Sequence, residues 1–143
     1  MKNSVSIQTF VFNHDYDNVI NLWENAGEGI QLRPSDEPEQ ILKKIQRDPE
    51  LFLVAKCDDK IIGAVLGGFD GRRGIMYHLA VDKKFRGQGI ASSLVDELEK
   101  RLKEKGCIRY YLLVVPENAN AISFYENRGW EIMNLSVFGK NLD

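Results

Sequence analysis

The most informative segment of the chain reads Leu79-Ala80-Val81-Asp82-Lys83-Lys84-Phe85-Arg86-Gly87-Gln88-Gly89-Ile90-Ala91-Ser92. Its first residues end an apolar run typical of a strand, and from Ile90 onward apolar residues recur every four positions, as in an amphipathic helix. Two glycines therefore stand between a strand and a helix. A helix N-terminus carries unpaired N–H groups and a partial positive charge, and glycines let a ligand approach the backbone. The stretch predicts a pyrophosphate site.

Other interpretations of this glycine turn differ in the ligand they predict. A nucleoside-triphosphate P-loop is excluded because no Gly-Lys-Ser/Thr follows the glycines. A nicotinamide dinucleotide turn comes closer, since Gly87, Gly89 and Ser92 approach its spacing and Glu117 is placed to bind a ribose. That fold requires repeated strand-helix-strand units, and the segments before this turn do not supply them. A solvated turn without any ligand also stays open.

The segments on either side of the turn predict the order of elements. Alternating apolar residues predict a strand over 5–12, and helical spacing predicts a helix from residue 17 to Gly27. Asp36, with Glu39 three residues later, predicts the capped start of a second helix. Further elements follow at 51–57, 61–69 and 75–81 (strands), 90–106 (helix), 109–115 (strand), 119–127 (helix) and 132–140 (a last strand pair).

This order, β-α-α-β-β-β-α-β-α-β, belongs to the α/β (α+β) class. It predicts a mixed central sheet of six to seven strands with about four helices, because one strand-helix-strand crossover interrupts antiparallel strands. The chain has 143 residues, of which 43% are hydrophobic, so we expect a single domain over 1–143.

Composition argues against several classes of partner. The net charge of −2, from 19 basic and 21 acidic residues, argues against nucleic acid. The sequence holds no apolar run of roughly 20 residues and no secretory signal, so we expect a cytoplasmic protein without a membrane partner. Cys57 and Cys107 have no metal-ligand spacing, and we expect neither a metal site nor a disulfide.

Two motifs resemble those of the GNAT superfamily of N-acetyltransferases. Arg86-x-x-Gly89-x-Ala91, preceded by Leu79-Ala80-Val81-Asp82, resembles the acyl-CoA-binding motif of that family. Asn118-x-x-Ala121-Ile122-x-x-Tyr125-Glu126-x-x-Gly129-Trp130 resembles its second conserved-type segment. The resemblance extends from Val5 to Leu142 and is strongest to a small bacterial branch related to YpeA.

The resemblance implies the GNAT fold and a reaction. An acetyl group would pass from acetyl-CoA, as co-substrate, to a primary amine of a small molecule or of a peptide or protein N-terminus, by direct attack in a ternary complex. No metal is implied. Homodimerisation through the C-terminal strand is compatible with the resemblance. A non-catalytic acyl-CoA-binding or sensing module on the same fold is the alternative function.

The resemblance also assigns the cofactor site. The pantetheine arm would lie between parallel strands at 77–81 and 110–115 that diverge towards their C-terminal ends. It would contact the backbone of Leu79 and Val81, and an N–H near Ala80 or Val81 would polarise the thioester carbonyl. The full expected cofactor-binding set is Leu79, Ala80, Val81, Arg86, Gly87, Gln88, Gly89, Ile90, Ala91, Ser92, Asn118 and Tyr125.

Tyr125 is the catalytic residue that the resemblance implies. A phenol with a pKa near 10 can donate a proton to a departing thiolate whose thiol has a pKa near 8.5 at modest cost. Asn118, Ala121 and Tyr125 share one helix face by their spacing. Without the resemblance, Asn118 reads as a helix cap and Tyr125 as a core aromatic residue.

The general base stays open. Related branches carry a glutamate at positions that correspond here to Leu113 or to the neighbourhood of Ile75, so a direct carboxylate base is in doubt. Tyr77 and His78 remain candidates, and strand alternation places them on opposite faces. A water relay to backbone carbonyls is the default expectation.

The acceptor site is predicted only in outline. The loop at 29–35 and the strand at Tyr77 are expected to line it, which makes Leu32, Arg33 and Tyr77 the substrate-binding candidates. Arg33 either binds an anionic group of the substrate or anchors its own loop.

Overall fold

The computed structural model describes residues 4–27 and 29–142. The chain divides into two compact units, residues 1–113 and 114–143. The first unit holds the sheet and most helices, whereas the second holds one described helix, α4 (Ala119–Asn127).

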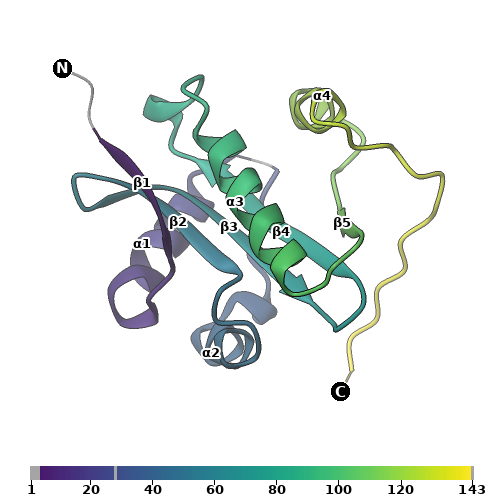
Figure 1. The fold of residues 1–143 in the computed structure, drawn as a ribbon, viewed down its shortest axis with the longest axis horizontal. Helices are drawn as coiled ribbons and strands as arrows, with labels where there is room; N and C mark the ends of the chain where they lie inside the picture. The colour runs from purple at the N-terminus through teal and green to yellow at the C-terminus, as the bar shows by residue number, and fades with distance from the viewer. Residues whose placement is uncertain (1–3, 28, 143) are drawn as a thin grey trace. The chain divides into compact units, whose positions relative to one another are not determined.

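The sheet of the first unit has five strands in the order β1-β2-β3-β4-β5 (Figure 1). Neighbours β1 to β4 pair antiparallel, and β4 pairs with β5 in parallel. The strand bounds are Val5–Thr9 (β1), Phe52–Cys57 (β2), Lys60–Phe69 (β3), Gly74–Val81 (β4) and Tyr110–Leu112 (β5). The expected mixed sheet is therefore confirmed.

Helices cover both faces of this sheet, with α3 in front and α1 and α2 behind in Figure 1. Their bounds are Phe12–Glu24 (α1), Pro38–Arg47 (α2) and Ile90–Glu104 (α3), with short 3₁₀ turns at Pro34–Asp36 (η1) and Lys83–Phe85 (η2). Val19, Leu22 and Trp23 of α1 pack into a buried cluster with Phe10 and Phe52. This burial fixes α1 on the sheet because apolar side chains leave water there.

Two glycines let α3 lie close to β3. A Cβ added at Gly67 would lie 2.4 Å from Cδ1 of Leu98, and one added at Gly63 would lie 3.1 Å from Cδ1 of Leu94. Both leucines are fully buried. The close approach of α3 sets the position of the turn that precedes it.

The first helices begin elsewhere than predicted. The first strand ends at Thr9, and α1 begins at Phe12 because the carboxylate of Asp15 accepts a hydrogen bond from the N–H of Val11 (2.8 Å). Glu37 precedes α2, whose first residue is Pro38, a favourable first helical position. The prediction that Asp36 caps this helix is wrong, since its side chain accepts from the N–H of Arg33 (3.0 Å).

The prediction of six to seven strands is also wrong, since the described residues form five. The expected strand at 109–115 is limited to Tyr110–Leu112, and residues 132–140 lie in no strand. Ile132 and Phe138 are 70% and 93% exposed. Alternation shows which side chains share a face, but a strand also needs a partner edge, and these apolar residues are covered by none. The strand on which the dimer expectation depended is therefore missing from the described residues.

Candidate functional site

The glycine turn between β4 and α3 contains two residues in a left-handed conformation. Gly87 and Gly89 both have φ of +80°, a left-handed conformation that favours glycine. Helix α3 begins at Ile90, and the N–H of Ser93 donates to the carbonyl of Gly89 (3.0 Å). The N–H groups of the first helical residues before Ser93 precede the first i→i−4 hydrogen bond of the helix, and they follow the exposed residues 87–89. The turn can therefore donate several backbone hydrogen bonds to an anion.

Arg86 fastens this turn to the rest of the first unit. Its Nε donates to the carbonyl of Val81 (3.1 Å) at the end of β4, and its Nη2 donates to the carbonyl of Ala26 (3.4 Å) just after α1. The guanidinium therefore holds a positive charge beside the turn and fixes the turn against two elements.

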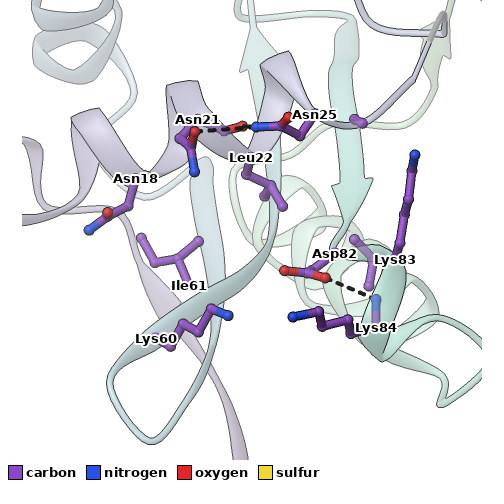
Figure 2. Close-up of a pocket in the computed structure, with 11 residues that line it drawn as sticks. Asn18, Asn21, Leu22, Asn25, Lys60, Ile61, Asp82, Lys83 and Lys84 are labelled. Atoms are coloured by element: carbon purple, nitrogen blue, oxygen red, sulfur yellow. Dashed lines mark hydrogen bonds between the residues drawn. The ribbon is translucent and has the colours of Figure 1, made fainter.

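A polar hollow of about 480 Å³ lies between α1, the start of β3 and the segment after β4. Figure 2 shows the ammonium groups of Lys60 and Lys84 extending toward each other across it, while Lys83 extends away. Asn18, Asn21 and Asn25 line it from α1. The carboxylate of Asp82 accepts from the N–H of Lys84 (2.9 Å). The lining contains the side chains of Lys60, Lys83 and Lys84 but only this one carboxylate. The hollow adds positive charge close to the glycine turn.

Strand β4 contains a bulge at His78. Tyr77 pairs with Leu66 and Ala80 pairs with Ala64, so one extra residue of β4 lies opposite β3 between these pairs. His78 has φ of +49°, which is unusual for a residue with a Cβ. The prediction of strict alternation along this strand is wrong at this point because the bulge shifts the faces.

Strand β4 pairs with β5 only over its first three residues. The pairs run from Gly74 with Tyr110 to Met76 with Leu112. From Tyr77 to Val81, no strand among the described residues pairs with this edge of β4. The parallel pairing is confirmed, and the second half of β4 has an open edge that is followed, after η2, by the glycine turn.

His78 and Asp36 form a pair that brings together β4 and the loop before α2. His78 Nε2 lies 3.1 Å from Asp36 Oδ2, and their side chains are 19% and 7% exposed. The His78 ring also contacts Trp23 edge to face, with ring centroids 4.8 Å apart. Burial acts to raise the pKa of Asp36, but the hydrogen bonds from His78 and the Arg33 N–H lower it overall. Asp36 is thus a charged carboxylate that orients an imidazole.

The three acceptor-site candidates lie in the first unit. Leu32 and Tyr77 are 36% and 42% exposed, which leaves both accessible to a ligand. The guanidinium of Arg33 donates to the side chain of Gln31 (3.0 Å), so it contacts its own loop, which is one of its two predicted roles.

The second unit holds the other two candidates. Helix α4 spans the predicted residues, and the Asn118 side chain accepts from the N–H of Ala121 (3.2 Å), which confirms its capping role. The Tyr125 ring contacts Phe124 and Trp130 edge to face, at 5.1 and 5.6 Å. Burial raises the pKa of the Tyr125 phenol to about 12. Tyr125 therefore stays protonated at neutral pH.

Reasoning from the sequence missed the role of Asp36. The only local signal was its spacing to Glu39, which pointed to a helix cap. Its contact with His78 joins residues 42 positions apart, and no local pattern encodes it.

Within residues 4–27 and 29–142, no helix is long and apolar enough to cross a membrane, and no cluster of three metal-ligating side chains occurs.

Comparison with known proteins places this geometry in a family. The sequence model of the acetyltransferase (GNAT) family matches residues 16–130. An acetyltransferase of Pectobacterium atrosepticum is 43% identical over 129 residues, covering 90% of this chain and 89% of the relative. Another, from Sodalis glossinidius, is 42% identical over 135 residues, covering 92% and 93%. The crystal structure of the PaiA N-acetyltransferase from Thermoplasma acidophilum, in complex with coenzyme A, has the same fold, with a TM-score of 0.79, 22% identity and 93% coverage of both chains. The chain therefore belongs to the acetyltransferase (GNAT) family of acyltransferases.

Proposed function

We propose that this chain transfers an acetyl group from acetyl-CoA to a primary amine of a small molecule or of a peptide or protein N-terminus. The amine would attack the thioester directly, in a ternary complex. The observation that carries the proposal is the continuity of two features in the first unit. The open edge of β4 from Tyr77 to Val81 is followed, after the short 3₁₀ turn η2, by the glycine turn at Gly87 and Gly89.

The first part of the proposed site binds the cofactor. The pantetheine amides would pair with the backbone of Leu79 and Val81 along the open edge of β4, as an added strand does. The pyrophosphate would accept hydrogen bonds from the turn and from the start of α3. The proposed contact residues there are Arg86, Gly87, Gln88, Gly89, Ile90, Ala91 and Ser92, with Asn118 contributing from α4.

The bulge of β4 supports a role in polarising the thioester. A bulge interrupts the ladder between Tyr77 and Ala80 and changes the direction of the backbone there. The N–H of Ala80 or Val81 would then donate to the thioester oxygen as negative charge develops on it. This donor needs no side chain, so its position depends on the backbone conformation at His78.

Tyr125 would protonate the leaving thiolate. A pKa of about 12 keeps the proton available, but it lies about 3.5 units above that of an ordinary thiol, which corresponds to roughly 5 kcal/mol for a complete transfer. This cost is larger than an ordinary phenol would give. Surroundings that raise the pKa of the phenol also raise the pKa of a thiol beside it. The difference between the two pKa values is therefore smaller than for a thiol in water.

The acceptor would bind next to Tyr77. The accessible side chains of Leu32 and Tyr77 offer apolar contact, and the Arg33 guanidinium, which already contacts Gln31, lies on the same loop as Leu32. This arrangement does not require the acceptor to carry a negative charge.

An acetylation screen tests the proposed function. Thiol release from acetyl-CoA would be followed with amino acids, polyamines, aminoglycosides and short peptides, each with a blank without protein. We expect at least one primary amine to accelerate thiol release, and the acetylated amine to appear in equal amount by mass spectrometry. Tight CoA binding without turnover on any amine would instead support an acyl-CoA-binding or sensing module.

A further inference from the structure

We propose that His78 is the general base of the acetyl transfer and that Asp36 is the residue that positions its ring. The proposal rests on the function proposed above and names the group that removes the proton from the acceptor amine. It replaces the expectation of a water relay, and it depends on a contact that only the folded chain makes.

The carboxylate of Asp36 is fixed from two sides. Its Oδ2 lies 3.1 Å from His78 Nε2 and accepts from the Arg33 N–H at 3.0 Å. The backbone of the same residue is held as well, since its carbonyl accepts from the Tyr16 hydroxyl (2.8 Å). A charged carboxylate only accepts hydrogen bonds, so this network assigns the ring proton to Nε2 and leaves Nδ1 of the neutral ring with a free lone pair.

Aromatic packing holds the imidazole ring in place. Trp23 contacts it at 4.8 Å, Phe52 stacks on Trp23 at 5.7 Å, and Phe10 stacks on Phe52 at 3.9 Å. These three supporting residues are almost fully buried, whereas the His78 side chain keeps 19% exposure. A rigid support with one accessible ring is what proton transfer to an incoming group requires.

The position of His78 on β4 connects it to the predicted oxyanion donors. It occupies the left-handed residue of the bulge, and Ala80 follows two residues later. A non-glycine residue is strained in this conformation, and such strain is concentrated at functional sites. The bulge therefore holds the imidazole beside Asp36, two residues before Ala80, whose N–H is one of the proposed donors to the thioester oxygen.

The other titratable groups around this pair are poorer bases. The Tyr77 ring lies 6.4 Å from the His78 ring, and burial raises the pKa of its phenol, so it is protonated at neutral pH. Burial also raises the pKa of Tyr16, and the charges of Glu37, Asp36 and Asp17 act in the same direction. The residues of β3 opposite the bulge, Val65 and Leu66, are apolar. Only the imidazole belongs to a type of side chain that exchanges a proton near neutral pH.

The proposed step begins with proton transfer to His78. Nδ1 of His78 takes one proton from the ammonium form of the acceptor, and the Nε2 proton stays in its hydrogen bond to Asp36. The amine nitrogen attacks the thioester carbon, the C–N bond forms, and the C–S bond breaks as Tyr125 protonates the thiolate and then regains a proton from water. The amide nitrogen then loses its second proton to solvent, and the imidazolium returns its proton to water.

The test replaces both histidines of the chain in the same way. His78→Asn removes the ring with a residue that tolerates positive φ, and His14→Asn is the matched control at an exposed position of α1. With the best acceptor from the screen, we expect kcat of His78→Asn to fall about 10²-fold at pH 7, a typical size for loss of a general base. CoA affinity and the His14→Asn kcat should match those of the wild type.

The pH profile separates a base from a structural residue. Wild-type kcat would be measured against pH with two acceptors whose amine pKa values differ by about 2 units. We expect the acidic limb to stay in place for the wild type and to follow the acceptor in His78→Asn. Asp36→Asn should lower kcat about tenfold and shift the acidic limb of the pH profile, because the ring loses its charged partner.

Two outcomes would overturn the proposal. One is a His78→Asn enzyme with unaltered kcat and profile, and the other is a wild-type limb that moves with the acceptor. If His78→Asn does not fold by circular dichroism, His78→Gln and the Asp36→Asn profile decide by the same criteria. Failure of the proposed function looks different, since wild-type protein would then transfer acetyl to no amine.

Discussion

The glycine turn and the Asp36–His78 pair lie in the same unit but are suited to different kinds of interaction. The turn presents backbone N–H groups on exposed residues, and its two glycines share a left-handed φ of +80°. The pair presents side chains that are mostly buried, joined at 3.1 Å and supported by aromatic rings. The turn is suited to hold a charge that never changes, such as a phosphate, whereas the pair is suited to exchange a proton.

This difference determines how each region responds to substitution. A backbone site tolerates changes of its exposed side chains and fails when φ or local charge is altered. A side-chain site fails when one functional group is removed, even if the backbone is preserved. Binding measurements should therefore respond to the turn, and rate or pH measurements to the pair.

The largest expected effect is on cofactor binding. In Gly89→Glu, a side chain must adopt φ near +80°, and its carboxylate would face the pyrophosphate. Two like charges about 5 Å apart repel by roughly 3 kcal/mol at an effective dielectric constant near 20, so we expect CoA affinity to fall at least about 10²-fold by calorimetry. Gly71→Glu is the control, because Gly71 has φ of +101° and open surroundings in another turn. Unchanged CoA affinity in Gly89→Glu would place the phosphate site elsewhere.

The next largest effect is expected at Tyr125, and it tests whether the phenol protonates the leaving thiolate. Tyr125→Phe deletes one hydroxyl and keeps the ring contacts with Phe124 and Trp130. We expect kcat to fall about 10²-fold while CoA affinity stays near that of the wild type. A kcat within about twofold of the wild type, with chemistry rate-limiting, would make Tyr125 a packing residue.

Alkaline titration provides an independent readout of Tyr125. Its folded-state pKa of about 12 lies above the ordinary value near 10, so its contribution to stability is complete below pH 10 and is lost as pH rises through about 12. The ultraviolet difference titration should lose one phenol near pH 12 in Tyr125→Phe. Loss of a phenol that titrates near pH 10 would contradict the assignment.

A smaller effect concerns the stability that the pair provides. The pKa of Asp36 is lowered in the folded state, so its contribution is present above the ordinary carboxyl range and is lost as pH falls through the folded-state value. Asp36→Asn should lower the free energy of unfolding by about 2 kcal/mol at pH 7, a typical cost for losing hydrogen bonds to a charge, and by less below pH 4. Urea unfolding at both pH values measures this. Asp58→Asn, in an exposed turn, is the control and should change little; a pH-independent loss in Asp36→Asn would show that its charge is unimportant.

The smallest effect concerns the packing of α3 on β3, which sets the position of the glycine turn. In Gly67→Ala the new Cβ would lie 2.4 Å from a methyl carbon of buried Leu98 and 3.1 Å from the carbonyl of Leu51. The helix must shift or Leu98 must repack, which should cost about 1–2 kcal/mol in unfolding free energy. Gly139→Ala, with nothing within 4 Å of the new Cβ, should stay within about 0.5 kcal/mol. Equal stability of both variants would show that α3 adapts freely.

Local signals predicted some elements to the residue and missed others. Helix α4 covers the predicted 119–127, and α3 begins at the predicted Ile90, because cap, spacing and stop signals lie within the same segment. The predicted alternation from Ile75 to Val81 missed the bulge at His78, since the extra residue exists only relative to β3. The apolar residues of 132–140 suggested strands, but pairing requires an edge that they do not share.

Local sequence patterns were sufficient to predict the order of elements as far as α4 and the glycine turn. The strand end, the glycines and the helix start lie within residues 81–90, and backbone sterics and helix periodicity act over only a few residues. The contact of Asp36 with His78 across 42 positions, and the separation of β4 from β5 after Met76, exist only in the folded chain. Such contacts depend on how helices pack on the sheet, which is set by burial of side chains distributed over the whole unit rather than by any one segment.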